Sequence, residues 1–206
     1  MLGAMARSYP QLVRGRPRDE EADVALVDAT LALLAEQGYS GLRMEAVAAR
    51  AGVAKATLYR RWPDKVSLTI AALSRIPELP AVDTGSLSGD LAALRDAVVR
   101  LFKTTRLASV LPALAAERVR RTSASAKIDA FIRTRYQPWI AAIERAIARG
   151  ELPRTSADPV LIADLLAGVM MQRVFFTGGR VDDKAWKTVV DIVVKGLRAA
   201  ASSPGG

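Results

Sequence analysis

The chain has 206 residues, of which 50% are hydrophobic and 25% are charged, and this balance excludes a disordered chain with too little apolar surface to fold. It contains neither cysteine nor histidine, so disulfides, thiolate metal sites, cysteine nucleophiles and histidine general bases are excluded. The net charge of +9 suggests an acidic partner such as nucleic acid.

Apolar residues recur at spacings of three and four without sustained alternation, which predicts an all-α protein. The first helix is expected at 19–37, ended by Gly38. Its inward face is expected to consist of Val24, Val27, Leu31 and Leu34. Two short helices are expected at 44–50 and 55–61; Pro63 then interrupts the pattern, and Asp64 can cap a fourth helix that reaches about Arg75.

A stretch rich in proline, glycine and serine, residues 76–89, is the best candidate for a loop between domains. Beyond it five longer helices are expected, at 90–107, 111–121, 125–149, 158–176 and 182–200. Pro138 should kink the helix at 125–149, and Asp158 followed by Pro159 is a good helix start. The chain is thus expected to contain about nine helices.

The second and third helices have the pattern of a helix-turn-helix unit. One face of the second helix carries Met44, Val47, Ala48 and Ala51. Gly52 can end this helix in the left-handed conformation, and Val53 can fill the gap between the two helices. The inward positions therefore fit a pair of short helices that lock together.

The third helix separates an anchoring edge from a polar edge. If Leu58 points inward, a rotation of about 100° per residue places Ala56 and Arg60 on the opposite side and Thr57 and Tyr59 on the flanks. In a major groove, Ala56 and Arg60 would meet base edges, with Arg60 suited to guanine, while the flanks would face phosphates. The alternative is an ordinary solvated pair of helices.

Basic residues stand on both sides of this unit. Lys65, at the start of the fourth helix, could hold a phosphate together with the helix N-terminus. Upstream, Arg14, Arg16 and Arg18 form a basic arm that could enter a narrow minor groove. A disordered, solubilising leader is the alternative for the arm.

Together these features resemble the DNA-binding segment of the tetracycline-repressor (TetR/AcrR) family of bacterial transcription regulators. The resemblance covers about 19–68 and is carried by GYSGLRMEAVAARAGVAKATLYRRWPDKVSL. More loosely, ADPVLIADLLAGVMMQRVFFTGG resembles a C-terminal helix of the family. The resemblance implies a homodimeric repressor that binds a palindromic operator and is released when a small-molecule effector enters its C-terminal domain.

The resemblance also implies roles for single residues. Lys55 and Ala56 look like base contacts, Thr57 and Tyr59 like phosphate contacts, and Lys65 like a phosphate-binding lysine. The chain departs from the family at Arg43, where serine or threonine usually caps the helix and contacts phosphate, so any contact there must be ionic. We assign 1–18 to a flexible basic arm, 19–66 to a three-helix DNA-binding domain, and 67–206 to an effector-binding and dimerisation domain.

Two sets of residues are expected to serve the larger domain. An isologous four-helix dimer interface would be built from the last two helices, with burial inside one subunit as the alternative. Its residues are Leu161, Leu165, Gly168, Val169, Phe176, Val189, Val190, Val193, Gly196 and Leu197. An apolar effector pocket, for which core packing is the alternative, would be lined by Phe102, Phe131, Tyr136, Trp139, Met170 and Phe175.

A cluster of cations lies far from the third helix along the chain. It comprises Arg118, Arg120, Arg121, Lys127, Arg133 and Arg135, and it suits a solvated surface, an acidic effector or a second DNA contact. No phosphate loop, paired-carboxylate spacing or nucleophile motif is found, so we expect no enzyme, cofactor or metal site, and an enzyme built on the C-terminal bundle is only a minor alternative. A helical protein that coats DNA without sequence preference stays as the main alternative.

A cytoplasmic location is expected, because the run VLIADLLAGVMM is short for a membrane span and carries Asp164.

Overall fold

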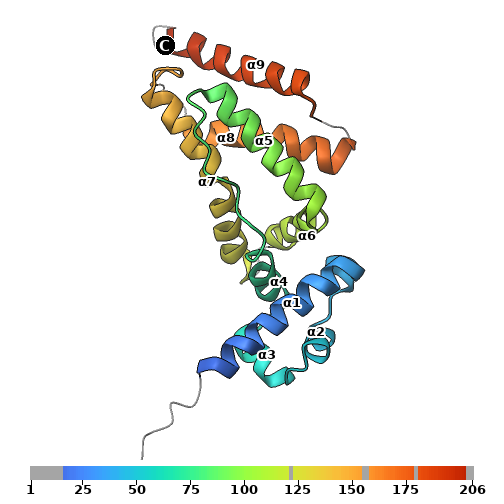
Figure 1. Ribbon diagram of the computed structural model, residues 1–206. Coiled ribbons are helices and arrows are strands. Elements are labelled where there is room, and N and C mark those ends of the chain that lie inside the picture. Colours follow the sequence, from blue (N-terminus) through green and yellow to red (C-terminus); the bar gives the residue numbers. More distant parts are fainter. Residues whose placement is uncertain (1–15, 121–122, 155–157, 179–180, 203–206) are drawn as a thin grey trace, which may run out of the picture.

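The computed structural model describes residues 16–120, 123–154, 158–178 and 181–202. These residues form nine α-helices and one π-helical turn, with no strand among them, so the all-α prediction is confirmed. Figure 1 shows the first four helices gathered at one end of an elongated molecule and the last five at the other end.

The first group consists of α1 (Arg16–Gly41), α2 (Met44–Ala51), α3 (Lys55–Arg61) and α4 (Lys65–Leu73). Because α1 begins at Arg16, residues 16–18 are helical rather than part of a flexible arm. Gly38 interrupts α1 at the predicted place, with φ 66° and ψ −178°. The predicted inward face of α1 is partly wrong, since Val24 is exposed and the fully or nearly fully buried positions include Leu26, Leu33 and Leu34.

Local hydrogen bonds explain the sharp ends of the short helices. Gly52 adopts φ 65°, and the N–H groups of Gly52 and Val53 bond the carbonyls of Ala49 and Ala48, which closes the end of α2. The carboxylate of Asp64 accepts a 2.7 Å hydrogen bond from the N–H of Ser67 and so caps α4. Both caps were predicted from the residue types.

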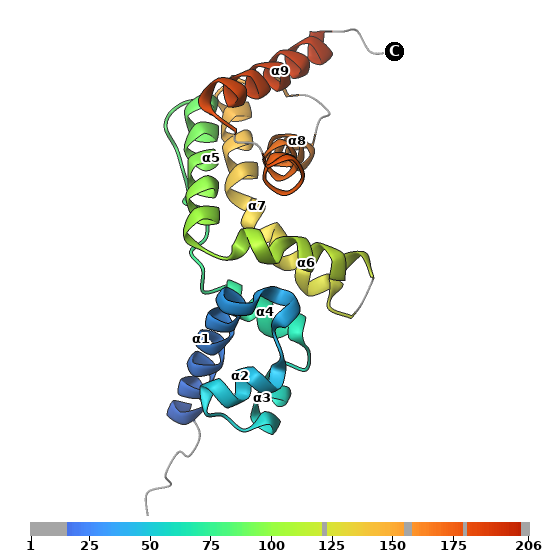
Figure 2. The same cartoon turned by 90° about the vertical axis from the view of Figure 1, so that its right-hand side faces the viewer.

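The second group consists of α5 (Leu87–Thr104), α6 (Leu107–Val119), α7 (Ser125–Ala148), α8 (Pro159–Gln172), the π-helical turn η1 (Arg173–Thr177) and α9 (Asp183–Ser202). The helices α5 and α6 begin earlier than predicted because Ser86 caps α5 and the hydroxyl of Thr105 accepts from the N–H of Leu107. The helix α7 continues through Pro138, and its two halves run in different directions in Figure 2.

Two clusters of buried side chains stabilise the molecule, and α7 contributes to both. The first cluster joins the small group to α6 and the beginning of α7, so that Leu58 and Leu73 share it with Leu114 and Phe131. The second joins α5, the rest of α7, α8 and α9. In Figure 2, α6 lies between α4 and the upper helices. The two groups are therefore packed together through α6 and α7.

Candidate nucleic-acid interface and cavity

The helix α3 lies at the end of the molecule opposite α9 (Figure 1). Leu58 is fully buried in the first cluster, whereas Lys55, Ala56 and Arg60 are exposed and Thr57 is partly exposed. This division matches the rotation predicted from Leu58 alone. One edge of α3 thus anchors the helix, and the opposite edge is free to meet a large partner.

Tyr59 is also exposed, but its hydroxyl already has an acidic partner. The Oη atom donates a 2.8 Å hydrogen bond to Oε1 of Glu45, which stands in the first turn of α2. This bond lowers the pKa of Glu45 and raises the pKa of Tyr59. The carboxylate of Glu45 therefore lies beside the hydroxyl that was predicted to contact a phosphate.

Two cations converge on one backbone carbonyl in the last turn of α1. Nη1 of Arg43 lies 3.2 Å from the carbonyl oxygen of Ser40, and Nζ of Lys65 lies 3.5 Å from the same atom. Nζ of Lys65 also stands 4.2 Å from the centroid of the Tyr39 ring. Burial and the charge of Arg43 lower the pKa of Lys65, so an anion placed between the two side chains would stabilise both charges.

The N-terminus of α2 adds to this basic site. Arg43 is the N-cap residue, and its side chain makes no capping hydrogen bond, as expected for an arginine in this position. The N-terminus of a helix together with two cations is the usual make-up of a phosphate site. Arg43 and Lys65 were predicted separately, and the structure brings them together.

Replacing Glu45 with glutamine is expected to strengthen binding to DNA. The change removes a negative charge beside Tyr59 but keeps the size of the side chain, so affinity should rise roughly threefold at low salt. The gain should shrink as salt is added, because exposed charges are screened. Fluorescence anisotropy with a labelled duplex measures this, and Glu144→Gln, on the exposed surface of α7, is the control of equal net charge. Equal gains in both variants would show that only net charge matters.

The basic arm is only partly covered by the structure. Arg14 lies outside the described residues, and Arg16 is the first residue of α1. A contact of either residue with a minor groove stays a prediction.

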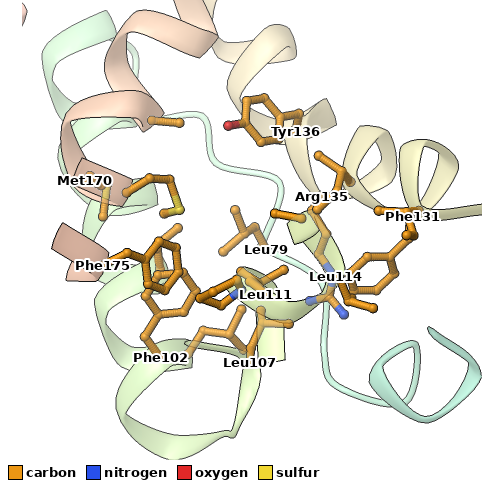
Figure 3. A pocket seen from close by; sticks show the side chains of 18 of the residues that line it. Leu79, Phe102, Leu107, Leu111, Leu114, Phe131, Arg135, Tyr136, Met170 and Phe175 are labelled. Carbon is orange, nitrogen blue, oxygen red and sulfur yellow. The ribbon is translucent and has the colours of Figure 1, made fainter. Parts of the chain in front are cut away.

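A cavity of about 470 Å³ opens among α5, α6, α7, α8 and η1 (Figure 3). It is lined by all six residues that were predicted for an effector pocket: Phe102, Phe131, Tyr136, Trp139, Met170 and Phe175. The rings of Phe102 and Phe175 pack at a centroid distance of 6.0 Å. Trp139 and Met170 are also almost completely buried in the second cluster, so they belong to the core and to the cavity wall at once.

Sequence reasoning missed the part of the cavity wall that α6 provides. Leu107, Leu111 and Leu114 line the cavity from α6. Arg118 on α6 and Arg135 on α7 also line it, and both belong to the cation cluster for which an acidic effector was one interpretation. The only available signal was the apolar content of α6, which does not show that these leucines face the same space as the aromatic side chains of α5 and α7. The size and apolar wall of this cavity are typical of a small-molecule site.

The residues predicted for a dimer interface divide into exposed, partly buried and buried positions. Leu161 and Leu165 on α8 are 55% and 53% exposed, Phe176 on η1 is 78% exposed, and both Gly168 and Gly196 are exposed. The prediction is wrong for Val190, because α9 turns this side chain into the second cluster. The other four residues are partly buried. Val189, Val193 and Leu197 pack against the second cluster, and the fourth is Val169 on α8.

The segment that carries this apolar surface is one continuous helical stretch, close to the predicted helix at 158–176. Because η1 continues α8, Pro159–Thr177 forms 19 helical residues, which by length and composition alone could cross a membrane, and 28% of its most apolar 18-residue window is buried. The judgement that the run is too short is therefore corrected. The helix carries Asp164 and packs its buried face against α7, so it also fits a soluble protein with one apolar face uncovered.

The comparisons with known proteins cover nearly the whole chain. Residues 26–72 match the family model "Bacterial regulatory proteins, tetR family", and residues 81–193 match "Tetracyclin repressor-like, C-terminal domain". The chain is similar to the uncharacterized HTH-type transcriptional regulator YdeS of Bacillus subtilis strain 168, with 31% identity over 94% of this chain and 98% of the relative.

Two further proteins extend this likeness. The DNA-binding transcriptional repressor TetR of Mycobacteroides abscessus is 30% identical over 86% of this chain and 94% of its own. Among solved structures, the TetR family transcription regulator SCO0332 matches with a TM-score of 0.64 and 26% identity, covering 86% of this chain and 98% of its own. Both parts of the chain therefore have counterparts in full-length proteins of the same architecture.

Proposed function

Because the chain belongs to the tetR family of bacterial transcriptional regulators, we propose that it is a repressor that binds a palindromic operator as a homodimer and leaves it when a small molecule binds. The observation that carries the proposal is the division of α3, with Leu58 buried and the Ala56 and Arg60 edge exposed at one end of the molecule. A transcriptional regulator of this kind acts in the cytoplasm, on the chromosome.

The contacts with DNA follow from the two edges of α3. Arg60 and Lys55 have long cationic side chains that can reach base edges, and Ala56 lets the helix approach closely. Thr57 and Tyr59 face the phosphates on either side. Arg43, Lys65 and the N-terminus of α2 hold a further phosphate and fix the position of the unit on the duplex.

The dimer is proposed to form through α8 and α9. Leu161, Leu165 and Phe176 form an exposed apolar surface on α8 and η1, and Ile192 adds a further exposed apolar side chain on α9. A second copy of the same surface would cover it by an isologous contact. The two α3 helices would then face two half-sites about one helical turn apart or slightly more.

The cavity is proposed to bind the effector, and α7 connects its wall to α4. Nζ of Lys127 on α7 lies 2.7 Å from Oγ of Ser67, and that hydroxyl donates to the carboxylate of Asp64, which caps α4. Lys65 is the next residue. A ligand that moves α7 would therefore displace the start of α4 and the phosphate site beside it.

The proposal is tested by selecting bound fragments from the genomic DNA of the source organism. We expect enrichment of a short palindrome whose half-sites are protected in footprinting and whose binding weakens steeply as salt is raised. If the selected fragments share no sequence and random duplexes bind with equal affinity, the proposal is wrong. The chain would then be a protein that coats DNA without sequence preference.

A further inference from the structure

The polar groups of the cavity show what its ligand must carry. Among the described residues that line it, Arg118 and Arg135 are charged, Tyr136 is polar, and the others are apolar; no acidic side chain is among them. We propose that the cavity binds an apolar molecule with a single acidic group, and that Arg135 recognises the acid. That such a ligand acts as the effector rests on the proposed function.

The two arginines differ in how far their charges are already neutralised. Arg118 is exposed and forms an ion pair with Asp129. Arg135 is partly buried, and among the described residues no carboxylate forms an ion pair with it. Burial lowers the pKa of Arg135, and the charge of Glu78 offsets this only in part. Arg135 is therefore the cation of the cavity wall that still lacks an acid.

The guanidinium of Arg135 is held in place by the last residue of α4 and by the segment that follows it. Nη1 donates to the carbonyl of Pro77 over 2.9 Å, and Nη2 donates to the carbonyls of Leu73 and Ile76 over 2.9 and 3.0 Å. These acceptors are neutral, so they satisfy donors without cancelling the charge. An arginine has five N–H donors, and three such bonds leave one on Nε and one on Nη1 for a ligand.

The surroundings of the guanidinium make an incoming anion favourable. Figure 3 shows it beside Leu114 and Phe131 at one end of the cavity, with Phe102, Met170 and Phe175 on the other side. Its Cζ atom stands 5.2 Å from the centroid of the Phe131 ring. A partly desolvated cation among apolar groups gains more from a carboxylate or phosphate than the same cation in water would.

The same arrangement fixes how the ligand lies. Its acidic group would sit at the end of the cavity formed by Arg135, and its apolar body would extend toward Phe102 and Phe175. Arg133 is only two residues away but is exposed and is not part of the cavity wall. Of these two arginines on α7, the structure therefore assigns recognition to Arg135.

The test compares acids with alcohols of the same shape, in the absence of DNA. The probes are decanoate with decan-1-ol, and 4-phenylbutyrate with 4-phenylbutan-1-ol, titrated into the full chain by calorimetry. At least one acid is expected to bind about tenfold or more tightly than its alcohol, the gain typical of a charge-assisted hydrogen bond. Arg135→Gln should abolish this preference, and Arg133→Gln should keep it.

Arg135→Gln also removes bonds to the end of α4, so its folding is checked by circular dichroism. Arg135→Lys separates loss of charge from loss of folding, because it keeps the positive charge. This variant should retain a weakened preference for the acid over the alcohol. The proposal is overturned if the alcohols bind wild-type protein as tightly as the acids, if no probe binds, or if the preference survives in Arg135→Gln. Since no DNA is present, these outcomes are separate from failure to bind an operator.

Discussion

Replacing Arg60 with alanine is expected to weaken binding to the operator by about tenfold to a hundredfold, the value of one good contact between an arginine and a base. Arg60 is exposed on the edge of α3 opposite Leu58, so the change removes a groove contact without disturbing the core. Fluorescence anisotropy with the selected palindrome at fixed salt measures the loss. The loss should be smaller on a duplex in which the contacted base pair has been changed.

The control for Arg60→Ala is Arg100→Ala, which removes the same charge from the exposed surface of α5. It should change operator affinity little, because a distant surface charge is screened. Thermal melting should show the same stability for both variants. Unchanged operator affinity in Arg60→Ala would contradict the placement of this edge of α3 in the groove.

Replacing Leu165 with glutamate is expected to convert the proposed dimer into a monomer. Leu165 is half exposed on α8, between Leu161 and the η1 turn, so a partner copy that covers this surface would bury the new charge among apolar side chains. Light scattering during gel filtration measures the mass. Operator affinity should fall about a hundredfold or more, because a monomer forfeits the gain from binding two linked half-sites.

Val119→Glu is the matched control for this substitution. Val119 is 76% exposed at the end of α6, away from the apolar surface of α8, so a glutamate there should leave the dimer intact. If Leu165→Glu stays dimeric at micromolar concentration, another surface must form the dimer. If wild-type protein is itself monomeric, the exposed apolar face of α8 needs a different explanation.

The short helices α2 and α3 could be predicted within about one residue, because their ends are determined by local chemistry. Gly52 and Pro63 are strong stop signals, and Asp64 is a strong cap. The starts of α5 and α6 were placed too late, because Ser86 caps α5 and the hydroxyl of Thr105 accepts from the first N–H of α6, within stretches that contain several small polar residues. The inward face of α1 was ambiguous, since apolar residues occur around much of its surface.

The functional surfaces were predictable to different degrees. The orientation of α3 follows from one buried leucine and the helical rotation, so sequence was sufficient there. The aromatic wall of the cavity could be guessed from residue type. The choice between Arg133 and Arg135, the pairing of Arg43 with Lys65 at Ser40, and the burial of Val190 all depend on which helices pack against each other. Periodicity within one helix carries no such information.

The central claim is that the exposed edge of α3 reads a sequence. The most direct measurement is the ratio of dissociation constants for the selected palindrome and for a scrambled duplex of equal length and composition at the same salt. We predict a ratio of about a thousandfold or more, as for other sequence-specific regulators. Equal dissociation constants for the two duplexes would contradict the claim.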